Sequence, residues 1–197
     1  MKSGRGRCTI MLLMLVSSAG QALSHPDVSA TARMEFRMDG TRLIGLTQNL
    51  VFDDATSRRL TSRFDKDRDG RLSETERGAL IQETGGRLAD RQFFVEATLA
   101  NRHLPLPRAS SISADLLEGR VVISGAFALP DLPDVRGQTL SLVIRDPDLT
   151  IAFRFDPGRP AELRDASPGC RVDVRSDPAM AYFGGLVTPE VLTLSCP

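Results

Sequence analysis

Acidic residues recur at alternate positions in one stretch in the first half of the chain, from Asp65 to Glu76. Aspartates stand at positions 65, 67 and 69, a glycine follows at 70, and a glutamate closes the stretch at 76. Glycine permits a sharp turn with positive φ, so carboxylates before and after it can face one another. Carboxylate oxygens are the ligands that hard divalent cations prefer. The stretch therefore predicts a cage of oxygen atoms for such an ion.

The spacing resembles the calcium loop of the EF-hand family, D-x-[DN]-x-[DN]-G-x5-E. The resemblance implies three aspartate side chains, a backbone carbonyl at the seventh position, a direct or water-mediated contact at the ninth, and a bidentate glutamate at the twelfth. The implied ligands are Asp65, Asp67, Asp69, Arg71, Ser73 and Glu76. Leu60 and Phe64 before the loop, and Leu80 and Ile81 after it, give each flanking helix an apolar side. We expect Leu72 to turn toward the core; the alternative is an acidic turn that binds nothing.

The first 24 residues have the three parts of a secretory signal peptide. A basic start precedes the apolar run 10–16, and small residues follow, with Ala22 and Ser24 in the positions of a cleavage site. The apolar run is shorter than the roughly 20 residues that a membrane span needs. We predict a mature chain that begins at His25 and is exported; an uncleaved N-terminal anchor is the alternative.

Charge and cysteine content bear on the partners and the compartment. The predicted leader holds three basic residues, so the mature chain has 22 basic residues (25 − 3 = 22) against 25 acidic ones. A slightly acidic chain without Trp argues against nucleic acid and anionic membranes as partners. Two cysteines remain, Cys170 and Cys196, and in an exported chain they predict one structural disulfide.

Most of the remaining chain has the pattern of β-strands. Apolar and polar residues alternate over 28–38, Asp39-Gly40 signals a turn, and 43–52 supplies a returning strand. Further strand-like segments are 93–99, 111–117, 120–129, 139–145, 149–155, 170–174 and 191–196. We predict an α+β fold, mainly antiparallel β (a sandwich or open barrel), as a single domain over 25–197. The EF-hand helix-loop-helix is inserted at about 54–88, with the paired carboxylates of Asp53 and Asp54 capping its first helix and Gly85-Gly86 ending its second.

Several short motifs, in their order along the chain, are similar to the bacterial periplasmic family called domain of unknown function 1007. They are His25-Pro26, Phe52-Asp53-Asp54, the acidic loop, Leu129-Pro130, Asp146-Pro147 with Ile151-Ala152-Phe153, and Gly169-Cys170. That family is described as the periplasmic component of a transport system beside membrane permeases of the nickel, cobalt or zinc type. The resemblance therefore implies a periplasmic location and an inner-membrane metal permease as partner; no feature indicates the oligomeric state.

A transition-metal site is the alternative function. The free amino group and imidazole of His25 could chelate zinc, nickel or cobalt, with Asp27 and His103 as further ligands. Members of the family often begin His-Pro-His, whereas this chain has Asp27 in the third place. Otherwise His25 is a frayed terminus and His103 a loop residue.

Enzymatic activity is the third class. The sequence contains no serine nucleophile elbow, phosphate loop or HExxH helix. A copper oxidase built on His25 would need His103, and Tyr182 as a further ligand. We therefore predict a non-enzymatic, exported calcium-binding protein. Its single loop should bind calcium with a dissociation constant of about 10⁻⁴ to 10⁻³ M, the range of extracellular modules.

Overall fold

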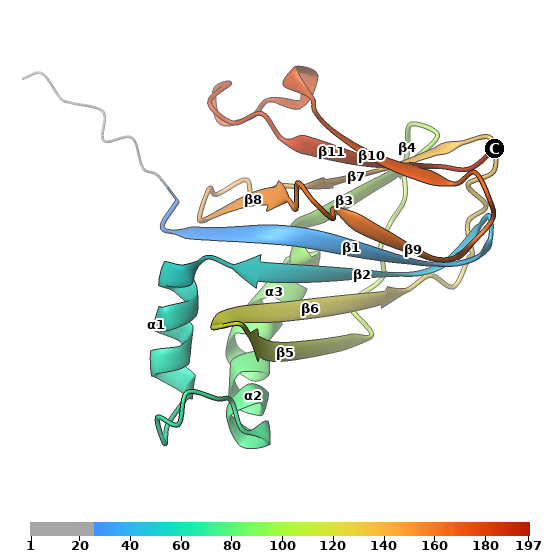
Figure 1. Ribbon diagram of the computed structural model, residues 1–197. Helices are drawn as coiled ribbons and strands as arrows, with labels where there is room; N and C mark the ends of the chain where they lie inside the picture. The colour runs from blue at the N-terminus through green and yellow to red at the C-terminus, as the bar shows by residue number, and fades with distance from the viewer. Residues whose placement is uncertain (1–25) are drawn as a thin grey trace, which may run out of the picture.

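Two β-sheets packed face to face carry a helical insertion at one end (Figure 1). The computed structural model describes residues 26–197, so the predicted leader and His25 lie outside the described residues. The chain enters through a long hairpin, β1 (Val28–Gly40) and β2 (Arg42–Phe52), whose turn uses Gly40 at φ 63°. The α+β, mainly antiparallel fold predicted from the sequence is confirmed.

The larger sheet has six strands in the order β5-β6-β2-β1-β8, with β9 also paired to β1. Besides the hairpin, its strands are β5 (Ser111–Leu117), β6 (Arg120–Ala128), β8 (Ile151–Phe155) and β9 (Ala161–Ala166). β8 and β9 run parallel to β1, one beside each half of it. The Asp156–Pro160 connection separates them, and β9 was not predicted.

The smaller sheet has five strands in the order β10-β11-β7-β3-β4. Its strands are β10 (Arg171–Ser176), β11 (Glu190–Ser195), β7 (Thr139–Ile144), β3 (Val95–Leu99) and the two-residue β4 (Arg102–His103), which was also not predicted. All its pairs are antiparallel. The disulfide Cys170–Cys196 joins the start of β10 to the end of β11, as predicted.

The core lies between the sheets. Alternate residues of β1 point into it, among them Met34, Phe36 and Met38, all at most 1% exposed. Phe93 packs edge-on against Phe127, with ring centroids 6.0 Å apart. A side chain at Gly125 would collide with the Phe93 ring, so this glycine admits the aromatic pair.

The insertion follows β2. It consists of α1 (Asp54–Phe64), α2 (Glu74–Leu80), a π-helical turn η1 (Ile81–Gly85), α3 (Gly86–Asp90) and a 3-10 turn η2 (Gln92–Phe94). Asp53 caps α1 by accepting a hydrogen bond from the Thr56 amide at 2.7 Å, as predicted. Asp54 instead forms an ion pair with Arg120.

The second helical segment does not stop at Gly85-Gly86; that prediction is wrong. Both glycines have right-handed helical dihedrals, and helical structure continues to Asp90. A Cβ on Gly85 would lie 2.9 Å from the Ile112 Cγ2 atom of β5. This glycine therefore serves close packing of the helix on the larger sheet, which a helix-ending position does not require.

The helices rest on the larger sheet, at β5 and β6 (Figure 1). The buried Ser57 hydroxyl donates to the Phe52 carbonyl at 3.2 Å and accepts from the Val121 amide at 3.0 Å. Leu72 of the loop is 7% exposed and joins the core, as predicted. Within residues 26–197, no helix combines the length and apolarity that a membrane crossing requires.

Candidate metal centre

The acidic loop spans the gap between α1 and α2 (Figure 1). α1 ends at Phe64, and Asp65 follows as its C-cap, with its amide donating to the Thr61 carbonyl at 2.8 Å. α2 begins after Ser73, which caps it. Two capped helices thus fix both ends of the loop.

Three carboxylates of the loop converge. Oxygens of Asp65, Asp67 and Glu76 lie within 4.8 Å of one another. Asp65 and Glu76 are each 7% exposed, whereas Asp67 faces solvent. An open, all-oxygen group of this kind could hold a hard divalent cation and leaves room for water ligands.

Backbone amides hold the first aspartate in place. The Asp65 carboxylate accepts from the Gly70 amide at 3.0 Å and from the Asp69 amide at 3.2 Å. Gly70 makes this turn possible because it adopts φ 78°, a region that side chains disfavour. A Cβ at this position would meet no atom within 4 Å, so the constraint is conformational.

Glu76 closes the loop from the opposite end. One carboxylate oxygen accepts from the Lys66 amide, and the other accepts from the Ser73 amide at 2.9 Å and its hydroxyl at 2.8 Å. Ser73 and Glu76 therefore form a capping box at the start of α2. Sequence reasoning missed this second role, although Ser-x-x-Glu ahead of an apolar run is its signal.

The structure brings together three of the six predicted ligands. The Asp69 carboxylate accepts from the Arg71 amide at 2.8 Å and is not part of the converging group. Arg71 is exposed, and the Ser73 hydroxyl is engaged in the capping box. Ligation by these three residues stays a prediction.

Electrostatics differ between the two ends of the cluster. Hydrogen bonds from the Ser73 amide, the Lys66 amide and the Ser73 hydroxyl lower the pKa of Glu76. The pKa of Asp67 is raised: the Asp69 amide acts to lower it, but desolvation, repulsion from Asp69 and Glu76, and a hydrogen bond with Asp65 outweigh that effect. Asp67 thus has negative neighbours that its own hydrogen bonds do not offset.

The residues of the alternative metal site do not join this cluster. His25 lies outside the described residues, and His103 is exposed in β4, paired with Thr98. Tyr182 lies elsewhere, with the Arg145 guanidinium 5.7 Å from its ring centre. Desolvation and the negative charge of Asp146 raise the Tyr182 pKa, and Arg145 opposes them.

Comparison with known proteins adds the family. No curated protein matches the sequence. A family model described as "Protein of unknown function (DUF1007)" matches residues 10–181, which is most of the chain. The matched span covers the acidic loop, both helices beside it and most strands of the two sheets. The chain therefore belongs to the DUF1007 family.

Proposed function

We propose that this protein is an exported, non-enzymatic calcium-binding protein that holds one ion in an EF-hand loop. The main support is that carboxylate oxygens of Asp65, Asp67 and Glu76 lie within 4.8 Å of one another, in a loop between two capped helices. Calcium accepts flexible oxygen cages with water among the ligands, which suits one exposed and two buried carboxylates. The ion would neutralise the repulsion that raises the Asp67 pKa.

Binding has a structural cost in this loop. Both carboxylate oxygens of Glu76 already accept hydrogen bonds, one from the Lys66 amide and the other from Ser73. Bidentate ligation therefore requires some of these hydrogen bonds to lengthen or break. Asp69 would also have to turn from the Arg71 amide to reach the ion. These rearrangements support a weak site with a dissociation constant of about 10⁻⁴ to 10⁻³ M.

A calcium titration of the full mature chain tests the proposal. We expect the melting temperature to rise between micromolar and about 10 mM calcium, because a ligand that binds the folded state alone adds about 1.4 to 2.7 kcal/mol at ten to one hundred times its dissociation constant. Glu76→Gln should abolish the rise. Glu74→Gln, two residues earlier and exposed, is the matched control and should retain it.

The location and partner are parts of the same proposal. Membership of the DUF1007 family and the Cys170–Cys196 disulfide support a periplasmic protein that assists an inner-membrane metal permease. Purification of the tagged protein from membranes solubilised in mild detergent should recover a polytopic permease. Recovery of no membrane protein would remove the transport role and leave the calcium proposal standing.

Zinc and nickel titrations separate the competing assignment. Binding of either metal at nanomolar concentration, lost in His25→Ala and retained in Glu76→Gln, would make transition-metal delivery the function. Nanomolar binding retained in His25→Ala but lost in Glu76→Gln would place that metal in the acidic loop, and affinity no better than millimolar would favour calcium as the ion of the loop.

A further inference from the structure

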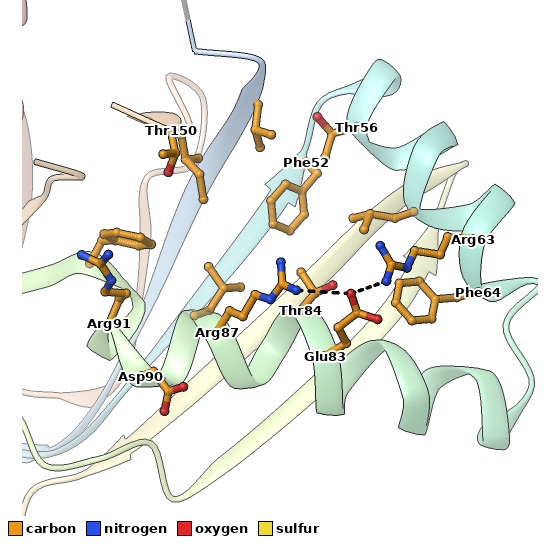
Figure 2. A pocket seen from close by; sticks show the side chains of 15 residues that line it. Phe52, Thr56, Arg63, Phe64, Glu83, Thr84, Arg87, Asp90, Arg91 and Thr150 are labelled. Carbon is orange, nitrogen blue, oxygen red and sulfur yellow. Dashed lines mark ion pairs between the residues drawn. The ribbon is translucent and has the colours of Figure 1, made fainter. Parts of the chain in front are cut away.

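A second concave site lies between α1 and the segment η1–α3, apart from the acidic loop (Figure 2). Its volume is about 550 Å³, within the range of pockets that bury small organic ligands. The floor is apolar and comes from strand ends of the larger sheet, from α1, from α3 and from η2; it includes Phe52, Leu60, Phe64, Leu88, Phe94 and Ile151. A pocket of this size and lining suits the apolar body of a small molecule.

The rim is cationic. Arg63 of α1, Arg87 of α3 and Arg91 contribute three guanidinium groups, and Glu83 of η1 lies between the first two (Figure 2). Asp90 also lines the pocket, but in Figure 2 its carboxylate points to the other side of the helix. Arg91 is paired with Asp148 at 3.0 Å. The excess positive charge therefore comes from Arg63 and Arg87, which share the single carboxylate of Glu83.

Glu83 occupies the position that a ligand's acid group would take. A single oxygen, Oε1, lies 2.6 Å from Arg63 Nη2 and 3.6 Å from Arg87 Nη2 (Figure 2). Two guanidiniums that converge on one carboxylate oxygen form a ready binding site for another carboxylate, because their planar donor arrays match its geometry. These ion pairs are largely exposed, so exchange of Glu83 for a ligand costs little.

The helix carries an irregularity at the same place. Glu83 and Thr84 both line the pocket and both belong to the π-helical turn η1. Single π turns are rare within α-helices and occur frequently at functional sites. Here the turn is seated by Gly85 against Ile112, so it is built into the packing of the helix on the sheet.

We propose that this pocket binds a small anionic amphiphile, a carboxylate with an aliphatic or aromatic body. The body lies on the apolar floor, and the carboxylate displaces Glu83 between Arg63 and Arg87. The charge of the rim selects an acid over an amine or an alcohol of the same length. The site does not depend on the metal centre, and its ligand binds in the presence of a chelator.

Calorimetry with three probes of equal chain length tests the selection. Decanoate, decanol and decylammonium are titrated into the mature protein in EDTA, below their micellar concentrations. We expect decanoate to bind about threefold more tightly than decanol, the ratio that an exposed ion pair supplies, and decylammonium to bind more weakly than both. Equal affinities for the three probes would overturn the proposal.

Two substitutions with opposite signs test the geometry. Arg87→Gln should weaken decanoate binding about threefold, whereas Glu83→Gln should strengthen it by a similar factor because the competing carboxylate is gone. Neither should change decanol binding. Arg58→Gln, which removes an exposed arginine of α1 outside the pocket, is the matched control and should leave decanoate binding unchanged.

The floor has its own test. Leu60→Gln keeps a helix-forming residue of similar size but places an amide in the apolar lining. We expect it to weaken decanoate and decanol alike; because Leu60 packs against the core, the melting temperature should fall, and circular dichroism checks that the variant is folded. Unchanged decanoate affinity in Leu60→Gln, or a fall in Glu83→Gln, would place the ligand elsewhere and refute the site.

Discussion

Two turns in this molecule are built on aspartate, and they use its charge differently. Asp146, 1% exposed, lies between β7 and β8 and accepts from the amides of Asp148, Thr150 and Ile151 at 2.8–3.0 Å, and from the Thr150 hydroxyl. Burial acts to raise its pKa, but these hydrogen bonds outweigh burial and the pKa is lowered. Its charge is satisfied by the chain itself.

The acidic loop is the contrasting case. Asp65, Asp67 and Glu76 converge, and the pKa of Asp67 is raised even though it accepts a hydrogen bond from the Asp69 amide. One carboxylate surrounded by donors stabilises a turn; several carboxylates that face one another leave a charge that a cation can neutralise. The difference separates a structural acid from a candidate ligand, although both occur in Asp-rich turns.

The largest expected effect tests the structural half of this comparison. Asp146→Ala leaves buried amides and the Thr150 hydroxyl without their acceptor, so it should lower the free energy of unfolding by about 1–3 kcal/mol. Denaturant unfolding measures the change. The control is Asp148→Ala, which removes an exposed ion pair with Arg91 and should cost under about 1 kcal/mol. If both variants lose the same free energy of unfolding, the four hydrogen bonds to Asp146 do not contribute more than an exposed ion pair.

The side-chain amide of Gln48 is a buried polar group without a hydrogen-bond partner in the described part of the chain. Gln48 of β2 is 0% exposed, and both polar atoms of its side chain lack a hydrogen-bond partner within the described part of the chain. Gln48→Met keeps the volume and removes the unsatisfied groups, so it should stabilise the protein by about 1 kcal/mol. The neighbouring Asn49 accepts from the Ser124 hydroxyl at 2.6 Å, so Asn49→Leu should not stabilise it. Thermal unfolding distinguishes the two.

In the acidic loop, removal of a carboxylate should stabilise the protein slightly, whereas removal of the Asp146 carboxylate should destabilise it. In EDTA, Asp67→Asn should raise the melting temperature, by less than Gln48→Met does, because it removes repulsion among the carboxylates. In calcium it should lower affinity, because one charged ligand is lost. A fall in EDTA would mean that Asp67 is held as firmly by its hydrogen bonds as Asp146 is.

The smallest effects appear as the pH changes. The folded pKa of Asp67 lies above its ordinary value, so its charged form is unfavourable; the advantage of Asp67→Asn in EDTA should shrink as the pH falls toward 4. The folded pKa of Asp146 lies below its ordinary value, so its stabilisation is complete above the unfolded pKa and is lost as the pH falls through the folded one. Melting temperatures from pH 7 to 2, for the parent and both variants, should show these two windows in that order.

The alternation of apolar and polar residues predicted most of the strands. Alternation over β1 and β2 and the turn at Gly40 are local signals, and they appear as predicted. The parallel pairing of β8 and β9 with β1 could not be predicted, because alternation states which face is buried but not which strand is adjacent. β9 is short and charged, so its pattern resembles a loop.

For the candidate site, the loop spacing located the three carboxylates that converge, because ligand spacing is itself local. The capping box and the Asp146 turn had sequence signals, Ser-x-x-Glu and Asp-Pro-Asp, that a wider search for side-chain acceptors would have found. The arginine-rimmed pocket had none, since its lining comes from segments far apart in the chain.

The position of β1 in the larger sheet determines which strands must pair last as the sheet folds. Among the described strands this one comes first in the sequence, yet one of its edges is covered only by β8 and β9, beginning with the pair Val28 and Ile151, 123 residues apart (151 − 28 = 123). Until β8 and β9 dock, that edge offers unpaired amides and carbonyls to any other strand. A partly folded chain is therefore prone to pair with its own copies, and the pairing of strands so far apart in the sequence is slow.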